Sequence, residues 1–573
     1  MTAPRSSAAP PVTGISLERA LAAWRADAEK GLRGASFEQV LVQERIPGLA
    51  VQPLYTEGDL PQADSRLHDL DRLGAGDLER RVHGAAWLNA PRIDIADPQQ
   101  ANRILLQELQ GGADALWLVS DAASRLALDP RTKSGEQAWG DGGVALYDMA
   151  AWEELLDGVH LEMVPLVLDC GGHPLPCLAP LLAYAEKRGL DRKALSWNLG
   201  ADPYGSLAAE GFHPGGAIWQ AQQLDALLRW TITEMPQARA FCLSAEPYHL
   251  AGATLAESLG LLLANAVQLM RQAESLGHPV ETVAAQIAMR LPIGRDVFLH
   301  AAGLRALRLL WRRVLQASGV QEVPPLWIHA VTSRRTLSRR DPWTNLLRTS
   351  TQLMAAAMGG AEAITAASFD EALGKPSTLG RRAARNAVQM MAAECGMSDV
   401  LDPLAGSYWG EAATSKLAEL AWEVFQEVEA EGGFGAAIGH GWVHTRLSQS
   451  WQKRSQALQD GEQVVLGVNR FAPTDETVPA QEPRIGDAEI AALARWRQRK
   501  EQNELAEELM PALGKDLDMS AFLTMAEAGA DVFEMNAAGR FALSDGRRPE
   551  AVEGLPQHRD AAAFEDNGTE APA

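Results

Sequence analysis

A repeated alternation of short apolar runs with longer amphipathic runs constrains the fold of this chain most strongly. Runs that are apolar throughout are typical of strands covered on both faces, as in parallel sheets. The amphipathic stretches between them, such as "APLLAYAEKRG" and "AAGLRALRLLWRRVLQASG", end in glycine, as many helices do. This strand-then-helix order predicts a parallel sheet. The predicted strands lie in residues 115–119, 163–169, 194–202, 240–246, 325–331 and 362–370.

The extent of this pattern favours a closed ring over an open sheet. At 573 residues the chain is too long for one ordinary core. Strand–helix units recur through residues 61–425, which suits eight units closed into a barrel. The predicted fold is therefore α/β, a (β/α)8 TIM-type barrel with an N-terminal arm and a C-terminal helical linker region.

The segments outside the predicted barrel carry weaker signals. Residues 1–14 lack the apolar core of a signal peptide and are expected to be a disordered leader. Residues 15–60 combine a helical pattern with an extended stretch broken by prolines, and we expect this arm to dock either on the barrel or on a partner. Residues 426–543 are predicted to be a helical linker region, and residues 544–573 a polar, disordered acidic tail.

One predicted helix, in "RRDPWTNLLRTSTQLMAAAMGG" (339–360), has clear ends. Asp341 can accept hydrogen bonds from the first free amides, and Pro342 suits the first helical position. No charged residue occurs between Gln352 and Gly360. Most of the circumference is compatible with burial, so we expect a helix of the outer ring that is packed on several sides. Its apolar positions are Leu346, Leu347, Leu353, Met354, Ala357 and Met358.

Composition excludes several classes of function. A net charge of -22 opposes binding to nucleic acid or to anionic membranes. No apolar run approaches the roughly 20 residues of a membrane helix, so no membrane span is expected. Four cysteines are too few for a disulfide framework, and reduced thiols and a cytoplasmic location are expected. The stretch "CGGHPLPC" (170–177) fits no standard zinc spacing, and no metal site is predicted.

Polar residues at the predicted strand ends are candidates for chemistry, because the active sites of such barrels lie there. A second interpretation is that each side chain caps the next helix or bonds a loop amide, and this interpretation is favoured for any one of them. The residues are Asp169, Asp202, Glu246, His329 and Asp370.

Several segments resemble a known family, the adenosylcobalamin-dependent methylmalonyl-CoA mutases. They occur in the family's order between about residue 37 and residue 540: "PLYTEGDL", "RRDPWTNLLRTSTQLMAAAMGGAEAI", "SFDEALGKPSTLGRRAARNAVQMMAAE", "DVLDPLAGSYWGE" and "LGVNRF". The resemblance implies an eight-fold barrel that holds acyl-CoA, then a linker and a flavodoxin-like domain that binds cobalamin. It also implies a radical 1,2-shift, for which the cofactor supplies the radical.

The family's cobalamin motif, Asp-x-His-x-x-Gly, does not occur in this sequence. The chain ends where the second domain would begin. The resemblance therefore implies that this chain alone does not hold cobalamin in the family's way, and that adenosylcobalamin is bound by a partner subunit.

The barrel segments depart from catalytic members of the family at positions that contact substrate. Where catalytic chains read "SGYHMQEAGAT", this chain reads "SAEPYHLAGAT" (244–254), which places Pro247 at the catalytic His and Glu246 at the Tyr. Proline offers no hydrogen-bond donor. Tyr248 and His249 lie further along and are candidate catalytic residues, with a locally bonded loop histidine as the favoured alternative.

A second segment departs in the same sense. Catalytic chains read "RTHxQTSGW" where this chain reads "WIHAVTSRRT", so His329 matches, whereas Trp327 replaces Arg and Val331 replaces Gln. His329 is thus a further candidate catalytic residue. The catalytic stretches "GFGTAEE" and "AFDLPTQ" have no clear counterpart, since "LWLVSDAASRLALD" stands in their place.

Four arginines follow the strand that ends near Val331 and are candidate substrate-binding residues. At the barrel mouth, their guanidinium groups could bind the phosphates of CoA. A solvated loop paired with acidic neighbours is the favoured alternative. The residues are Arg334, Arg335, Arg339 and Arg340.

Together these features predict a small, non-catalytic subunit of a heterodimeric methylmalonyl-CoA mutase. A homologous large subunit would carry adenosylcobalamin and interconvert (R)-methylmalonyl-CoA and succinyl-CoA. This chain would then meet acyl-CoA only through the complex and would be inactive alone. One alternative is a catalytic barrel of the isobutyryl-CoA mutase type, served by a separate cobalamin-binding chain. Another is an acyl-CoA-binding or regulatory protein without a mutase partner.

Overall fold

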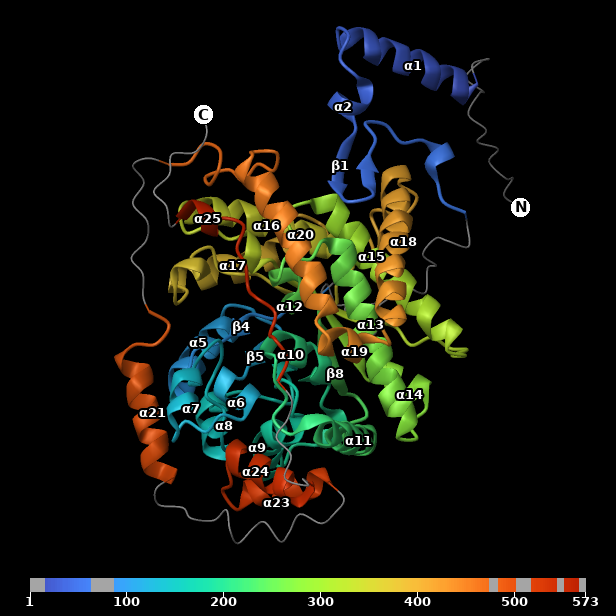
Figure 1. Cartoon of the computed structure of the whole chain (residues 1–573). Coiled ribbons are helices and arrows are strands. Elements are labelled where there is room, and N and C mark those ends of the chain that lie inside the picture. The colour runs from blue at the N-terminus through green and yellow to red at the C-terminus, as the bar shows by residue number, and fades with distance from the viewer. Residues whose placement is uncertain (1–15, 63–86, 474–482, 501–516, 544–550, 566–573) are drawn as a thin grey trace, which may run out of the picture. The chain divides into compact units, whose positions relative to one another are not determined.

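The computed structural model describes residues 16–62, 87–473, 483–500, 517–543 and 551–565 (Figure 1). The chain divides into two compact units, which are residues 1–60 and residues 61–573.

The N-terminal unit consists of short elements. No residue of α1 (Leu17–Gly31) is buried. Trp24 packs edge-to-face on Phe37, at the start of α2 (Phe37–Leu41), with the ring centroids 5.9 Å apart. β1 (Gln43–Ile46) and β2 (Leu49–Val51) pair as an antiparallel hairpin, and the 3-10 turn η1 (Glu57–Asp59) follows.

A ring of parallel strands forms the centre of the second unit. Its first stretch is split: β3 (Leu88–Asn89) pairs with the last strand, β11, whereas β4 (Arg92–Ile93) pairs with β5. Only Ala90 and Pro91 separate the two halves, so the sheet returns to its own beginning and closes. The remaining strands are β5 (Leu116–Val119), β6 (Leu166–Asp169), β7 (Asn198–Ala201), β8 (Arg239–Ser244), β9 (Ile287–Ile293), β10 (Trp327–Thr332) and β11 (Ala363–Thr365).

This ring confirms the predicted (β/α)8 barrel, and each of the six predicted strand runs contains a strand. Two parts of the ring, β9 and the 88–93 stretch, were not predicted from the sequence. Arg290 and Pro292 interrupt the apolar run of β9, and Pro91 divides the first stretch. Both interruptions weaken the local pattern, because proline and charged residues are depleted in strands.

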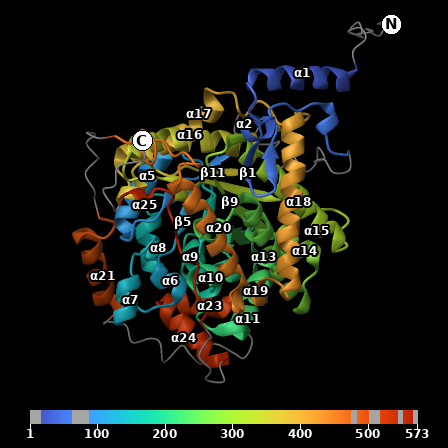
Figure 2. The same ribbon diagram turned by 45° about the horizontal axis from the view of Figure 1, so that its top comes forward.

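Helices follow the strands and surround the ring (Figures 1 and 2). In the first half these are α5 (Pro98–Gln110), α6 (Ala122–Leu126), α7 (Lys133–Ala138), α8 (Met149–Leu156), α9 (Pro174–Lys187), η3 (Arg192–Ala194), α10 (Pro203–Glu210) and α11 (Gly216–Glu234). In the second half they are α12 (Glu246–Leu250), α13 (Leu255–Ser275), α14 (Val280–Ala285), α15 (Val297–Ala317), η4 (Arg334–Thr336), α16 (Pro342–Met358), η5 (Glu371–Leu373), α17 (Thr378–Ala393) and α18 (Tyr408–Ala430). No described helix combines the length and the apolar character needed to cross a membrane.

Helix α18 lies directly against α13 and α15. At Gly260 of α13, a Cβ atom would fall 2.6 Å from the carbonyl oxygen of Ala421 and 2.7 Å from Cβ of Val424. A larger residue would push the two helices apart, so glycine permits this close approach.

Helix α16 is capped as predicted but is oriented differently from the prediction. The Asp341 carboxylate accepts a hydrogen bond from the Thr344 amide at 3.1 Å, and Gly359 ends the helix. The helix is packed on several sides, as expected, because nine of its residues are buried and it contacts α15, α17 and the strands β9 to β11. However, Leu347 is 68% exposed and three further apolar side chains of this helix also face solvent. These three are Trp343, Leu346 and Met354. Polar residues occupy much of the buried face instead.

Helices continue after the barrel. They are α19 (Phe434–Gly439), α20 (Trp442–Gln459), α21 (Asp487–Lys500), α23 (Met519–Glu527) and α24 (Val532–Leu543). Helices α23 and α24 pack on α9 and α11. The sequence predicts disorder across 544–573, whereas within that segment residues 551–565 make specific contacts and end in α25 (Ala562–Glu565).

Candidate functional site

The axis of the barrel, where a threaded ligand would pass, is filled by large side chains. Trp117 of β5 and Trp327 of β10 are both buried, and the His329 ring lies edge-on to Trp117 with a centroid distance of 5.0 Å. β5 and β10 are not neighbours in the ring, so contacts between them cross its interior. The Arg290 guanidinium lies 4.2 Å from the centroid of Trp117 and fills the space between strands. Smaller side chains complete the packing, namely Leu88, Val119, Val167, Cys242, Ala288, Val331 and Ala363.

His329 has a complete set of hydrogen-bond partners inside this packing. Arg290 Nε donates to its Nδ1 at 3.2 Å, which leaves the proton on Nε2. Nε2 lies 2.8 Å from Thr365 Oγ1, and that hydroxyl donates in turn to the carbonyl oxygen of Ala90. Burial, with Arg290 nearby, lowers the pKa of His329 well below its ordinary value. The ring is therefore neutral at physiological pH, and both nitrogens are engaged within the protein.

Tyr248 and His249 lie in α12, just after β8, and point to different neighbours. The Tyr248 hydroxyl is buried and accepts a hydrogen bond from Asn265 Nδ2 at 3.4 Å. Burial raises its pKa well above the ordinary value for tyrosine. His249 Nε2 lies 2.6 Å from Ser333 Oγ, and burial, together with Arg335, lowers the pKa of His249 well below its ordinary value. The described contacts bring neither residue to His329.

The four candidate arginines are spread over different partners. Arg334 pairs with Glu246, with Nη2 and Oε1 2.9 Å apart. Burial lowers the pKa of Arg334, but Glu246, Glu371 and Asp94 together outweigh it and raise that pKa. Arg335 is buried and donates to the carbonyl oxygens of His249 and Ala253. Burial, followed by repulsion from Arg454, lowers the pKa of Arg335 to about 9.

The other two candidate arginines bond backbone carbonyls. Arg339 Nε donates to Ala372 O at 2.7 Å, and Arg340 Nη1 donates to Val468 O at 3.4 Å. The four guanidinium groups therefore have separate partners and do not converge on one anion site.

The other polar residues at strand ends act in capping or in ion pairs. Asp202 caps α10 by accepting from the Gly205 amide at 2.9 Å, and burial raises its pKa to about 6. Asp370 accepts from the Ser377 amide at 3.0 Å, and Asp169 pairs with Arg290 at 3.0 Å. These contacts match the interpretation in which strand-end side chains bond loop amides and neighbouring charges.

Residues 551–565, which we term the C-terminal strap, cross the loops at the carboxyl ends of the strands (Figure 1). The Leu555 amide donates to Ala208 O after β7, the His558 amide donates to Leu250 O after β8, and the Asp560 amide donates to Arg335 O after β10. The His558 ring stacks on Trp451, with centroids 4.2 Å apart and planes 2° from parallel. The strap therefore covers the face where barrel enzymes place their active sites.

Asp560 anchors the strap among three arginines. Its carboxylate forms a two-point contact with Arg454, at 2.7 and 2.5 Å, and lies 3.3 Å from Arg295 and 3.9 Å from Arg335. Burial opposes ionisation, but the three arginines outweigh it and hold the pKa of Asp560 well below its usual range. One buried carboxylate thus offsets part of the charge of three guanidinium groups.

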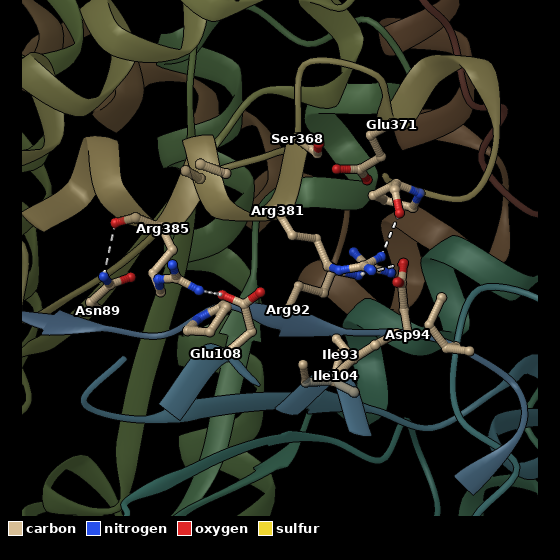
Figure 3. A pocket seen from close by; sticks show the side chains of 15 residues that line it. Asn89, Arg92, Ile93, Asp94, Ile104, Glu108, Ser368, Glu371, Arg381 and Arg385 are labelled. Atoms are coloured by element: carbon tan, nitrogen blue, oxygen red, sulfur yellow. Dashed lines mark hydrogen bonds and ion pairs between the residues drawn. The ribbon is translucent and has the colours of Figure 1, made fainter. Parts of the chain in front are cut away.

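An open cleft lies to one side, where the ring of strands is split (Figure 3). It encloses about 600 Å³ of space that is continuous with solvent, between the 88–93 stretch and α17. Arg92 lies 3.2 Å from Asp94, and Arg385 lies 3.1 Å from Glu108, so arginines and carboxylates alternate along the wall. Arg381 and Glu371 add one charge of each sign. This balance gives the cleft little net attraction for an anion. The sequence analysis did not predict it, although Arg381 and Arg385 stand one helical turn apart.

Among the described residues, no group of three or more His, Cys, Asp or Glu side chains could hold a metal ion. Three thiols, Cys170, Cys177 and Cys242, are buried and unpaired, and Cys395 is exposed. Burial raises the pKa of Cys177 well above its ordinary value, so this thiol is protonated and unreactive.

Comparison with known proteins accounts for this architecture. The sequence profile of the family described as methylmalonyl-CoA mutase matches residues 44–543. The chain belongs to the methylmalonyl-CoA mutase family. This confirms the resemblance seen in the sequence segments, and members of the family are isomerases that generally depend on adenosylcobalamin.

Several relatives within the mutase family cover most of the chain. The methylmalonyl-CoA mutase small subunit of Streptomyces virginiae is 33% identical over 454 residues, which span 79% of this chain and 69% of the relative. The methylmalonyl-CoA mutase of Cereibacter sphaeroides is 30% identical over 84% of this chain and 69% of its own length. The mitochondrial mutase of Homo sapiens is 24% identical over 86% of this chain and 66% of its own length.

Within this mutase barrel, the sequence analysis missed the residues that fill the axis. Trp117 and Arg290 carry no motif, and their role depends on strands that are distant in sequence meeting across the ring. In the sequence, the one sign that the axis is filled was Trp327, which stands where catalytic chains have Arg.

Proposed function

We propose that this chain is a small, non-catalytic subunit of methylmalonyl-CoA mutase. In this proposal it pairs with a homologous large subunit that interconverts (R)-methylmalonyl-CoA and succinyl-CoA. The filled barrel axis carries the proposal: Trp117 and Trp327 occupy the space in which the family resemblance implies acyl-CoA, and both are buried. A pantetheine chain and these two indole rings cannot share that space.

The side chains that could donate a proton to a substrate are already hydrogen-bonded to other groups of the protein. A proton donor must lie within hydrogen-bond reach of the reacting group and must have a proton to give. His329 uses both ring nitrogens for Arg290 and Thr365, and its lowered pKa keeps it neutral. We therefore propose that His329 has a structural role, and we extend this proposal to Tyr248 and His249 because both are buried and bonded within loops.

The residues at the barrel mouth do not fit a corrin ring. The C-terminal strap occupies this face, and Asp560 is held there by three arginines. Of the described histidines at the mouth, His249 is buried against Ser333, and the His558 ring lies flat on Trp451. We propose that adenosylcobalamin is bound by the large subunit.

Two observations support a partner. The relative in Streptomyces virginiae is named a small subunit, which suggests that a larger chain accompanies it. The N-terminal unit exposes apolar side chains on short elements, namely Leu17, Trp24, Val40 and Leu54. Such a unit buries too little apolar surface to be stable alone. We propose that it is the arm that binds the partner, and that the complex is cytoplasmic.

Co-purification with the large mutase chain, followed by assay of each chain alone and of both together, tests this function. We expect a stable complex, turnover by the complex, and no turnover by this chain with adenosylcobalamin alone. Turnover by this chain together with an isolated cobalamin-binding chain would overturn the non-catalytic assignment. Failure of the two chains to associate would overturn the pairing.

A further inference from the structure

The arginine cluster at the barrel mouth carries more charge than its one carboxylate balances. Arg295 follows β9, Arg335 lies in η4 after β10, and Arg454 lies in α20. All three meet at Asp560, and within the described part of the chain no other carboxylate forms an ion pair with any of them. Three positive charges therefore face one negative charge at a buried position. Uncompensated buried charge is costly, so a dianion would match this cluster better than a monoanion does.

The Asp560 carboxylate also fills the cluster incompletely. Arg454 uses both of its oxygens, at 2.7 and 2.5 Å, whereas the ion-pair distances to Arg295 and Arg335 are 3.3 and 3.9 Å. Arg335 is only 5% exposed, and its Nε, which is the atom that faces Asp560, has no hydrogen-bond partner among the described residues. An unpartnered buried donor that faces a bound anion indicates that an anion with more acceptor oxygens would satisfy the cluster better.

The electrostatics of the three arginines agree with this geometry. Burial opposes the charge of each guanidinium group, and Asp560 outweighs burial only at Arg454, whose pKa is raised. The pKa values of Arg295 and Arg335 are lowered, chiefly by burial, and repulsion from Arg454 adds to this effect. Two of the three arginines therefore lack sufficient counter-charge.

Arg335 departs from the catalytic pattern of the family. In the segment "WIHAVTSRRT", Arg335 stands where the catalytic pattern "RTHxQTSGW" ends in Trp. An uncharged ring is thus replaced by a cation, which is held in place because its Nη1 donates to the carbonyl oxygens of His249 and Ala253. Of the four arginines that the sequence marked as candidates, only Arg335 belongs to this cluster. The positive charge here is therefore not part of the catalytic pattern.

The C-terminal strap makes few buried contacts besides Asp560. Of its residues, only Leu555, Asp560 and Ala561 are buried. The match to the mutase profile ends at residue 543, before the strap begins. Single amide bonds join the strap to the loops after β7, β8 and β10. A segment held in this way opens locally at a lower cost than global unfolding, and it can act as a tethered competitor for the site that it covers.

We propose that Arg295, Arg335 and Arg454 form a binding site for a phosphate group, and that the Asp560 carboxylate occupies this site when no such ligand is bound. A phosphate monoester carries a charge of about -1.5 to -2 at pH 7 and three strong acceptor oxygens. Three guanidinium groups match it in both charge and number of donors. Binding of the phosphate group releases Asp560, and with it the strap, from the loops at the mouth. This site does not depend on the proposed pairing with a large chain.

The first test is isothermal titration calorimetry with inorganic phosphate on the full chain and on its Asp560→Ala variant. The variant removes the internal competitor, so we expect Kd for phosphate to fall at least about tenfold relative to the parent. The matched control is Glu553→Ala, which removes an exposed carboxylate of the same strap and should leave Kd unchanged. Adding Arg454→Gln to Asp560→Ala should abolish the gain in affinity.

The second test uses the parent chain, so it stands even if Asp560→Ala does not fold. Hydrogen–deuterium exchange is compared in about 20 mM phosphate and in sodium chloride of equal ionic strength, because a tethered competitor acts at an effective concentration on the order of millimolar. We expect faster exchange in phosphate of the His558 and Asp560 amides, which donate to Leu250 and Arg335 while the strap is bound.

Several outcomes would overturn this proposal. The site is refuted if Asp560→Ala binds phosphate no more tightly than the parent, or if Arg454→Gln leaves the gained affinity in place. Release of the strap is refuted if phosphate and chloride give equal exchange. Acetate that binds as tightly as phosphate would assign the site to a monocarboxylate and refute the phosphate group as its ligand.

Glycerol 3-phosphate separates the two sources of a phosphate group. A lower Kd than for inorganic phosphate supports a phosphate monoester as the ligand, and a higher Kd supports the free ion. The pairing with a large chain is tested separately by co-purification, so failure of the phosphate site leaves the proposed function in place.

Discussion

The barrel mouth and the outer side of α16 differ in which of their groups have partners. At the mouth, Asp560 meets three arginines and His249 meets Ser333, so these polar groups bond within the chain. On the outer side of α16, Leu346 and Leu347 are exposed, whereas Trp343 stacks on the Phe369 ring with centroids 5.0 Å apart. The fold therefore supplies partners for the polar groups of the mouth and leaves two leucines of α16 in contact with water.

We expect the largest effect on this comparison from low pH, which acts on histidines in the interior of the chain. Four buried histidines and the partly buried His300 have lowered pKa values, to about 4 for three of the five. The unfolded chain takes up protons near pH 6.5 whereas these rings do not, so stability is present above about pH 6.5 and is lost as the pH falls toward 4. Each ring contributes at most about 1.4 kcal/mol per pH unit. The residues are His173, His213, His249, His300 and His329.

Urea unfolding followed at pH 7 and pH 5 measures this loss, and we expect a markedly lower midpoint at pH 5. His213→Gln removes one of the titrating rings and should make the pH dependence shallower. An unfolding free energy that does not change between the two pH values would show that these rings are not held neutral.

Opening the barrel axis is the next largest perturbation. Trp117→Ala should lower the free energy of unfolding by about 4 kcal/mol, because it removes a large buried ring and leaves a cavity. Chemical denaturation measures the change. A loss below about 1 kcal/mol would mean that the axis is loosely packed, which would weaken the case for a closed barrel.

The third largest loss of stability is expected when the C-terminal strap is released. Asp560→Asn should cost about 3 kcal/mol at pH 7, because it leaves Arg295, Arg335 and Arg454 without a counter-charge. The folded pKa of Asp560 lies below its unfolded value, so this contribution is present above about pH 4 and is lost as the pH falls further. The difference between parent and variant should therefore shrink at low pH, and a difference that is constant with pH would contradict the ion cluster.

The smallest effect is expected on the outer surface of the barrel. Leu347→Glu should change the free energy of unfolding of the isolated chain by less than about 0.5 kcal/mol, since its side chain is exposed. Thermal unfolding of the chain alone provides the measurement. A large loss would mean that this leucine packs within the chain, and the contrast with the mouth would disappear.

The barrel could be predicted from sequence because its signals are local. Each predicted strand is a continuous apolar run, and the caps of α16 lie within a few residues of the helix. The orientation of α16 could not be predicted in this way. It depends on hydrogen bonds that Asn345 donates to Phe369 and Gln352 donates to Thr336, and on one that Gln352 accepts from the Ser333 amide. Only the tertiary fold determines the positions of these partners.

The candidate site was predicted less well for the same reason. Substitutions at Pro247 and Trp327 indicated a loss of chemistry, but the packing of Trp117 against His329 joins strands that are far apart in sequence. The strap has the composition of a disordered tail. It is ordered because Asp560 meets arginines from three separate segments, and no local pattern records that meeting.

The interrupted strand at 88–93 has a mechanical consequence. Pro91 has no amide hydrogen, and the two halves of this stretch join the ring through only short pairings with β11 and β5. The circle of hydrogen bonds is therefore thin at this point, as it also is between β6 and β7, which share one register pair. When the native state opens locally, the amides of Leu88 and Ala90 should exchange with deuterium before those of β8 to β10.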